Sequence, residues 1–182
     1  MIKLFLSFLI LYLPYITYAK DVKTNNVITS KKDLIFTDQI EEYLPKKLPE
    51  IEFYDINDTK HLLEEYDNNI VILHFWATWC TVCVHELPGL DRLKKDFKKE
   101  PIKIIALSED FKGQEAVKEF YNHHNIKNLE IYIDKKNQLF SAFNIIGLPT
   151  TIFINKNNTE IARIAGEVDW YDEKLREKIL SY

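Results

Sequence analysis

Residues 70–75 constrain the fold of this chain most, because five of the six are apolar. A short run of this kind is typical of a β-strand buried on both faces of a sheet that helices cover. Residues 80–99 follow with apolar side chains on one side and charged ones opposite, which predicts a helix. Pro88 is predicted to kink this helix, since proline lacks a backbone donor. The segment 76–83 therefore joins a central strand to a helix.

Strand-like and helix-like segments alternate along the rest of the chain. Strands are predicted at residues 51–54, 60–63, 102–107, 130–133, 151–154 and 160–165, and helices at 114–124, 138–143 and 170–181. The last two strands form a predicted hairpin around Asn157 and Asn158. This order of elements predicts an α/β fold, with a mixed central β-sheet flanked by helices on both faces.

Cys80 and Cys83 are the only cysteines, and their spacing is typical of a thiol–disulfide redox centre. At a helix start the first thiol lies near unpaired backbone N–H groups, which favour its thiolate, so Cys80 is the expected nucleophile. Cys83 is expected to resolve the mixed disulfide. A structural disulfide and half of a metal site are the competing interpretations. A metal would need further ligands, and His123 and His124 are expected to face solvent, so no metal is predicted.

Composition limits the chain to one domain and excludes several classes of partner. Its 182 residues, 46% of them hydrophobic, suffice for one packed core. The formal net charge of -4 arises from interspersed signs, so neither nucleic acid nor an anionic surface is expected as a partner. The sequence has no nicotinamide or flavin motif, and no cofactor is predicted beyond the redox-active disulfide of Cys80 and Cys83.

The N-terminus has the pattern of an export signal. Lys3 precedes the apolar residues 4–13, and residues 17–19 offer the small side chains that a signal peptidase reads. The apolar part is about half as long as a membrane-spanning helix. Residues 1–19 are therefore predicted to be a cleaved signal peptide, with an uncleaved membrane anchor as the alternative. Export would place the chain in the periplasm or another extracytoplasmic compartment, where disulfides persist.

A less regular stretch precedes the domain. Residues 20–32 carry few large apolar groups and are predicted to be a linker. Residues 34–44 have apolar positions suited to a short helix or to a segment over the core, before Pro45 and Pro49 interrupt them. Residues 20–47 are thus predicted to be a linker and a poorly defined segment, and the domain to span residues 48–182.

Three motifs in order give the chain a family resemblance. Residues 75–83 read Phe-Trp-Ala-Thr-Trp-Cys-x-x-Cys, Glu86-x-Pro88 follows, and residues 147–151 read Gly-Leu-Pro-Thr-Thr. Together they resemble the TlpA/ResA-like branch of the thioredoxin superfamily, over roughly residues 48–182. The resemblance implies a thioredoxin-like fold and an exported or membrane-anchored thiol–disulfide oxidoreductase. Such proteins commonly reduce apocytochrome c or the copper-site cysteines of cytochrome oxidase, and a membrane electron donor reduces them again.

The resemblance also implies roles for single residues. Pro149 matches the family's cis-proline beside the disulfide, and the backbone of Leu148 would then pair with an extended client segment. Glu86 lies three residues after Cys83, on the same face of the predicted helix. It also matches an acidic residue near the family's active site and is expected to take the proton of Cys83. An ordinary trans proline, and a solvated charge on the helix, are the plainer interpretations of Pro149 and Glu86.

Other features leave the function open. His74 stands where relatives carry an acid or an asparagine, and it is either a proton relay or a hydrogen-bonded core residue. Trp79 is the better candidate than Trp76 for contact with clients, although both suit aromatic packing. Thr81-Val82 lacks the proline found in many relatives, so the direction of electron flow is undecided. A DsbA-like oxidant and a thiol-binding or copper-site assembly chaperone remain alternatives, although the chain past residue 19 lacks the further cysteine or methionine that a copper carrier favours.

Overall fold

A mixed eight-stranded sheet forms the centre of the protein in the computed structural model, which describes residues 40–48 and 52–182. The order of its strands is β1-β8-β7-β4-β5-β6-β2-β3. Their bounds are Ile40–Lys47 (β1), Glu52–Asp55 (β2), Lys60–Leu62 (β3), Ile70–Trp76 (β4), Ile102–Ser108 (β5), Tyr132–Ile133 (β6), Thr150–Ile154 (β7) and Thr159–Ala165 (β8). The α-helices are Thr81–Asp96 (α2), Gln114–His124 (α3), Gln138–Ala142 (α4) and Glu173–Ser181 (α5). Short 3-10 turns lie at Leu63–Tyr66 and Lys135–Asn137.

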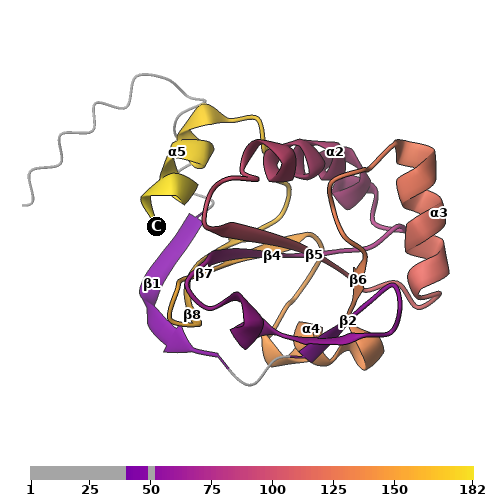
Figure 1. Ribbon diagram of the computed structural model, residues 1–182, viewed down its shortest axis with the longest axis horizontal. Helices are drawn as coiled ribbons and strands as arrows, with labels where there is room; N and C mark the ends of the chain where they lie inside the picture. The colour runs from indigo at the N-terminus through magenta and orange to yellow at the C-terminus, as the bar shows by residue number, and fades with distance from the viewer. Residues whose placement is uncertain (1–39, 49–51) are drawn as a thin grey trace, which may run out of the picture.

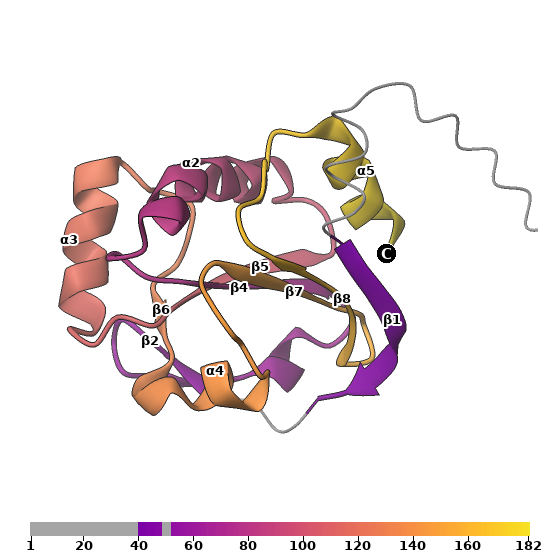
Figure 2. The same ribbon diagram turned by 180° about the vertical axis from the view of Figure 1, so that it is seen from behind.

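Helices cover both faces of this sheet, which confirms the predicted fold class. Figures 1 and 2 show α2 and α5 on one side of the strands and α4 on the other. β4 lies at the centre with all seven residues buried, parallel to β5 and antiparallel to β7. Its predicted burial on both faces is therefore correct.

The side chains of β4 alternate between two cores. Ile72 and Trp76 belong to the core under α2, α3 and α5, together with Leu87, Leu90 and Leu93 of α2. Val71, Leu73 and Phe75 belong to the opposite core, which α4 closes with Leu139 and Phe143. Because side chains alternate along a strand, His74 points to the same side as Ile72 and Trp76, toward α2. That placement decides what His74 can contact.

The C-terminal helix begins later than predicted. α5 starts at Glu173 rather than at Trp170, because Asp172 caps the helix by accepting a hydrogen bond from the Leu175 backbone N–H at 3.0 Å. Trp170 is buried in the preceding loop, and Leu175 and Ile179 are buried as predicted. The hairpin of β7 and β8 has Asn158 in the left-handed conformation at its turn, with φ of 52°.

The edge of the sheet was not predicted. β1 pairs antiparallel with β8, so residues 40–44 lie in a strand and do not form the short helix that was one of the two expectations for them. The register shifts between Glu42 and Lys46, around Pro45. An edge strand with such an irregularity accommodates a proline, which cannot donate to the ladder.

The predicted signal peptide or anchor at residues 1–19, and the linker up to residue 39, lie outside the described residues. Within residues 40–48 and 52–182, no helix has both the length and the apolar character needed to cross a bilayer.

Candidate active site

Cys80 and Cys83 form a disulfide at the N-terminus of α2, with their Cα atoms 5.3 Å apart. Cys80 is the N-cap residue, and its Sγ accepts a hydrogen bond from the Cys83 backbone N–H at 3.2 Å. Cys83 is fully buried, whereas Cys80 retains 9% of its surface. The two sulfurs are therefore unequal: the one at the helix end is the one that another molecule can reach.

The Leu148–Pro149 peptide bond is cis, as the resemblance implies. It immediately precedes β7, the strand that pairs with β4. Among the described residues, neither backbone polar group of Leu148 makes a hydrogen bond, whereas the carbonyl of Pro149 accepts one from Gly166 at 2.9 Å. Within residues 40–48 and 52–182, the backbone donor and acceptor of Leu148 are thus unpaired, in a segment that lines the same pocket as Cys80.

A pocket of about 440 Å³ lies against Cys80. Its lining comes from the loop before α2, the loop after β5, the α4 region and the segment before β7. The lining residues are Trp79, Cys80, Glu109, Phe111, Asn137, Phe140, Gly147 and Leu148. Of the residues predicted to contact clients, Trp79 and Leu148 therefore line one pocket together with Cys80.

The two tryptophans of the motif have different places. Trp76 is fully buried and stacks on Tyr121, with ring centroids 5.8 Å apart. Trp79 is 59% exposed and lies parallel to Phe111. Trp76 is therefore a packing residue of the core, and the ring of Trp79 is the one that another molecule can contact.

Glu86 is buried between α2 and the loop before α5, so it is not a solvated helix charge. Its Oε2 accepts a hydrogen bond from the Val168 backbone N–H at 2.7 Å. Its Oε1 lies 3.2 Å from Nε2 of His74, although the angle between the two groups does not meet hydrogen-bond geometry and neither atom has another described partner. Glu86 lies one helical turn after Cys83, which keeps the carboxylate on the side of the buried thiol.

His74 continues this buried chain of polar groups. Its Nδ1 lies 2.9 Å from Oγ1 of Thr151 on β7, and its ring meets that of Trp170 edge-on at 5.9 Å. The imidazole ring of His74 therefore lies between the hydroxyl of Thr151 and the carboxylate of Glu86, and it is not exposed to solvent. These contacts agree with the interpretation of His74 as a hydrogen-bonded core residue. They also place His74 next to Glu86, and its role in proton movement stays a prediction.

Glu109 is a further acidic group in the site, which the sequence analysis did not single out. It follows β5, is 3% exposed and lines the pocket beside Cys80. Burial raises the pKa of Glu109 to about 9, and the nearby carboxylates of Asp134 and Asp110 add to the effect. Its carboxyl group is therefore protonated at neutral pH. Glu109 reaches Cys80 because the C-terminal ends of the parallel neighbours β4 and β5 lie at the same edge of the sheet.

Asp110 fixes the loop that leads into Cys80. Its Oδ2 accepts hydrogen bonds from the Thr78 backbone N–H at 2.9 Å and from Ser108 Oγ at 2.7 Å, and its Oδ1 accepts one from Thr78 Oγ1 at 2.5 Å. Three bonds to one carboxylate tie the loop before α2 to the end of β5. Asp110 thus holds Thr78, two residues before Cys80, and it was not predicted from the sequence either.

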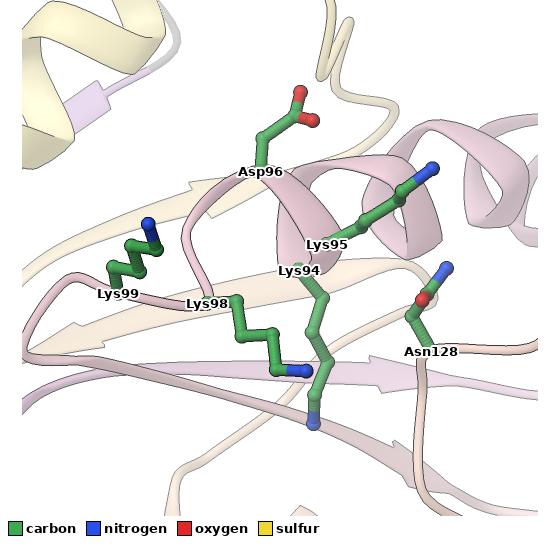
Figure 3. Close-up of a pocket in the computed structure, with 6 residues that line it drawn as sticks. All are labelled: Lys94, Lys95, Asp96, Lys98, Lys99 and Asn128. Atoms are coloured by element: carbon green, nitrogen blue, oxygen red, sulfur yellow. The ribbon is translucent and has the colours of Figure 1, made fainter.

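A second hollow, of about 550 Å³, lies at the opposite end of α2, lined by Lys94, Lys95, Asp96, Lys98, Lys99 and Asn128. Figure 3 shows that the lysine side chains extend in different directions, so their ammonium groups do not converge on one point. Lys94 pairs with Glu130 and donates a hydrogen bond to the Ile104 carbonyl at 3.2 Å. This hollow shares no residue with the pocket at Cys80. Among the described residues, no three His, Cys, Asp or Glu side chains are grouped as a metal site would require.

Known proteins resemble most of this chain. The profile of the AhpC/TSA family matches residues 44–162. Thiol-disulfide oxidoreductase ResA of Bacillus thuringiensis subsp. konkukian (strain 97-27) is 32% identical over 132 residues, which cover 72% of this chain and 75% of the relative. ResA of Bacillus cereus (strain ATCC 10987 / NRS 248) is 33% identical over 122 residues, covering 67% and 69%.

Solved structures share the fold at lower sequence identity. A putative thiol:disulfide interchange protein DsbE from Chlorobium tepidum has a TM-score of 0.67 at 23% identity, over 78% of this chain and 98% of that one. StoA from Bacillus subtilis has a TM-score of 0.60 at 22% identity, over 71% and 95%. These likenesses show that the mixed sheet and its helices form a thioredoxin-like fold.

Proposed function

This chain belongs to the AhpC/TSA family and is a thioredoxin-like thiol–disulfide oxidoreductase, and on that premise we propose that it is an exported reductant of disulfides in client proteins. The observation that carries the proposal is the inequality of the two sulfurs. Cys80 lies at a helix N-terminus and on a pocket wall, whereas Cys83 is enclosed. Such an arrangement suits attack by one thiol and resolution by the other.

The proposed reaction transfers two electrons to the client. In the reduced protein the Cys80 thiolate attacks one sulfur of the client disulfide, and the other client sulfur leaves as a thiolate that takes up a proton. Cys83 then loses its proton and attacks Sγ of Cys80, which releases the second client thiol and closes the protein disulfide. The helix dipole and the backbone N–H of Cys83 stabilise negative charge on the Cys80 sulfur.

We assign client binding to Trp79, Leu148 and Pro149. Leu148 lines the pocket, and its N–H and C=O, which have no partner among the described residues, are available to an extended client segment. Main-chain pairing of this kind tolerates varied sequences, because it uses no side chain of the client. It therefore suits a protein that acts on more than one client.

Two carboxyl groups support the proton transfers in this scheme. Glu86, one turn from Cys83 and enclosed in the core, takes the proton that Cys83 must lose, with His74 as its buried neighbour. Glu109 is neutral beside Cys80 near pH 7, because its pKa is about 9. A neutral carboxyl does not repel the Cys80 thiolate and is able to donate a proton to the departing client sulfur.

The proposal also covers the direction of electron flow, the client proteins and the compartment in which the protein works. The similarity to ResA proteins and the export-like pattern of residues 1–19 support an extracytoplasmic reductant. Its clients would be cysteine-containing proteins such as apocytochrome c or the copper-site proteins of cytochrome oxidase. A membrane thiol–disulfide donor would restore the reduced form, with residues 1–19 either removed or retained as an anchor.

Trapping of mixed disulfides tests this proposal. Cys83→Ser leaves Cys80 able to attack but removes the resolving thiol. We therefore expect client proteins to accumulate in mixed disulfides with Cys80, which dithiothreitol reduces. Cys80→Ser serves as the matched control and is expected to trap none. Full client maturation with Cys80→Ser would contradict the proposal and leave only a binding module or chaperone.

A further inference from the structure

Exposed apolar side chains concentrate around the redox centre. The large apolar residues most exposed among the described residues are Trp79, Val82, Phe111, Ile146, Tyr171 and Leu180. The first four lie beside the cysteines or on segments that line the pocket. Ile146, which is 94% exposed, immediately precedes Gly147 of the pocket lining. Exposed apolar side chains that are grouped in this way, in contrast to single scattered ones, are typical of a binding surface.

Phe111, like Ile146, belongs to this surface but lies outside the family motifs. It is 83% exposed, and its ring lies parallel to that of Trp79, with an interplanar angle of 6° and centroids 6.3 Å apart. The two rings come from different loops, one before α2 and one after β5. With so little of Phe111 buried, its contribution to folding is small, and its apolar surface is available to another molecule.

We propose that Trp79, Phe111 and Ile146 hold a large apolar side chain of the client, located two residues from the client cysteine that Cys80 attacks. This inference rests on the proposed function and names the client sequence that the pocket selects. Cys80 and the two stacked rings line one pocket, so an occupant must bring its sulfur and its apolar group to the same side. In an extended segment, residues two apart face the same side.

The remaining lining favours the same occupant. Phe140 and Leu148 add apolar surface, and Glu109 adds a carboxyl group that is neutral near pH 7. Glu109 is the one carboxyl group in the lining, so apart from the Cys80 thiolate the pocket offers no negative charge to a lysine or arginine of the client at that pH. An aromatic or branched aliphatic residue gains most from entering it, because the gain scales with the apolar area removed from water.

Single-turnover kinetics with peptide disulfides test the inference. The pre-reduced protein is mixed with a ten-residue peptide that has an internal disulfide and phenylalanine two residues before its first cysteine, or with the same peptide carrying serine there. Two electrons pass from the Cys80–Cys83 dithiol to the peptide, which leaves as a dithiol. Each rate is divided by the rate of the same protein variant with glutathione disulfide, and acid quenching followed by alkylation measures both.

We expect the phenylalanine peptide to react about tenfold faster than the serine peptide with the unaltered protein. Phe111→Ser is expected to reduce this preference to about twofold, and Phe111→Leu to retain most of it. Leu180→Ser is the matched control, because Leu180 is also exposed and apolar but lies on α5, whose C-terminal end is beside β1 at the far edge of the sheet (Figures 1 and 2).

Three results would overturn the inference, and they separate it from the proposed function. Equal rates for both peptides, with glutathione disulfide still reduced, would overturn the client preference alone. An unchanged preference in Phe111→Ser would overturn the assignment to this residue. Failure to reduce any of the three disulfides would overturn the inference together with the proposed function on which it rests.

Discussion

Glu86 and His74 face each other across the core between α2 and β4, with Oε1 and Nε2 3.2 Å apart and neither side chain exposed to solvent. The other oxygen of Glu86 is held by the Val168 backbone N–H, and the other nitrogen of His74 lies against Thr151. This arrangement joins the helix of the two cysteines to the central strand and to β7. It also places a titratable pair one helical turn from the buried thiol.

Replacing Glu86 by glutamine tests its role in proton transfer. The amide oxygen of Glu86→Gln can still accept the Val168 N–H, but the side chain can no longer take a proton from Cys83. We expect the resolution step to slow about tenfold or more at pH 7, because general bases typically contribute factors of this size or larger. The decay of a preformed mixed disulfide on Cys80, followed by mass spectrometry, measures this step.

Glu86→Ala is the companion variant for stability. It leaves the Val168 N–H and His74 without their buried partner, so we expect the free energy of unfolding to fall by about 1–3 kcal/mol. An unchanged resolution rate in Glu86→Gln, with Glu86→Ala destabilised as expected, would assign Glu86 a purely structural role.

Glu109 predicts a specific dependence of stability on pH. The pKa of Glu109 is raised from 4.5 to about 9 in the folded protein, so the folded state keeps a proton that the unfolded chain releases between these values. The free energy of unfolding therefore decreases as pH rises through this range. In Glu109→Gln this contribution is absent.

Urea unfolding of the oxidised protein at pH 5 and at pH 8 measures the Glu109 effect. Between pH 5 and pH 8 we expect Glu109→Gln to gain about 4 kcal/mol in the free energy of unfolding relative to the unaltered protein. Glu119→Gln, on α3 outside the pocket, is the control. Parallel pH profiles for Glu109→Gln and the unaltered protein would show that Glu109 is ionised near neutral pH.

Loss of the Asp110 carboxylate is expected to lower both the stability of the protein and the reactivity of Cys80. Asp110→Ala removes three hydrogen bonds, two of them to Thr78, so we expect a loss of about 2–4 kcal/mol in the free energy of unfolding. The loop before Cys80 should then lose protection, and hydrogen exchange at the Thr78 amide should speed up. The rate of client reduction should fall with it.

Asp91→Ala provides the matched control for Asp110. Asp91 Oδ1 accepts hydrogen bonds from the backbone N–H groups of residues 127–129, away from the pocket at Cys80. We expect a comparable loss of stability with no change in Thr78 exchange in the native state. Equal effects of both variants on Thr78 would contradict the positioning role of Asp110.

Local sequence signals predicted the part of the site that lies close together along the chain. The apolar segment 70–75 and the helix after it fixed where Cys80 and Cys83 would lie, because a strand followed by an amphipathic helix leaves little freedom between them. The family resemblance supplied the cis bond before Pro149. Glu86 was expected near Cys83 from helical spacing, but its burial against Val168 depends on a contact across 82 residues.

The missed features depend on pairing between distant segments. Glu109 and Asp110 reach the site because β5 runs parallel to β4, with Ser108 beside Trp76, and single-sequence patterns do not give that register. β1 was missed because Pro45 argues against a strand, and only pairing with β8 at the sheet edge accommodates it. Phe111 was passed over because its ring partner, Trp79, lies on another loop.

The reduction potential of the Cys80–Cys83 couple distinguishes a reductant of client disulfides from an oxidant of client thiols. The protein is equilibrated with defined thiol/disulfide buffers, and its free thiols are counted after alkylation. For a reductant that a donor supplies with electrons, we expect a potential near or below about -230 mV, toward the value of thioredoxin. A value near about -120 mV would contradict this expectation and identify the protein as an oxidant of client thiols.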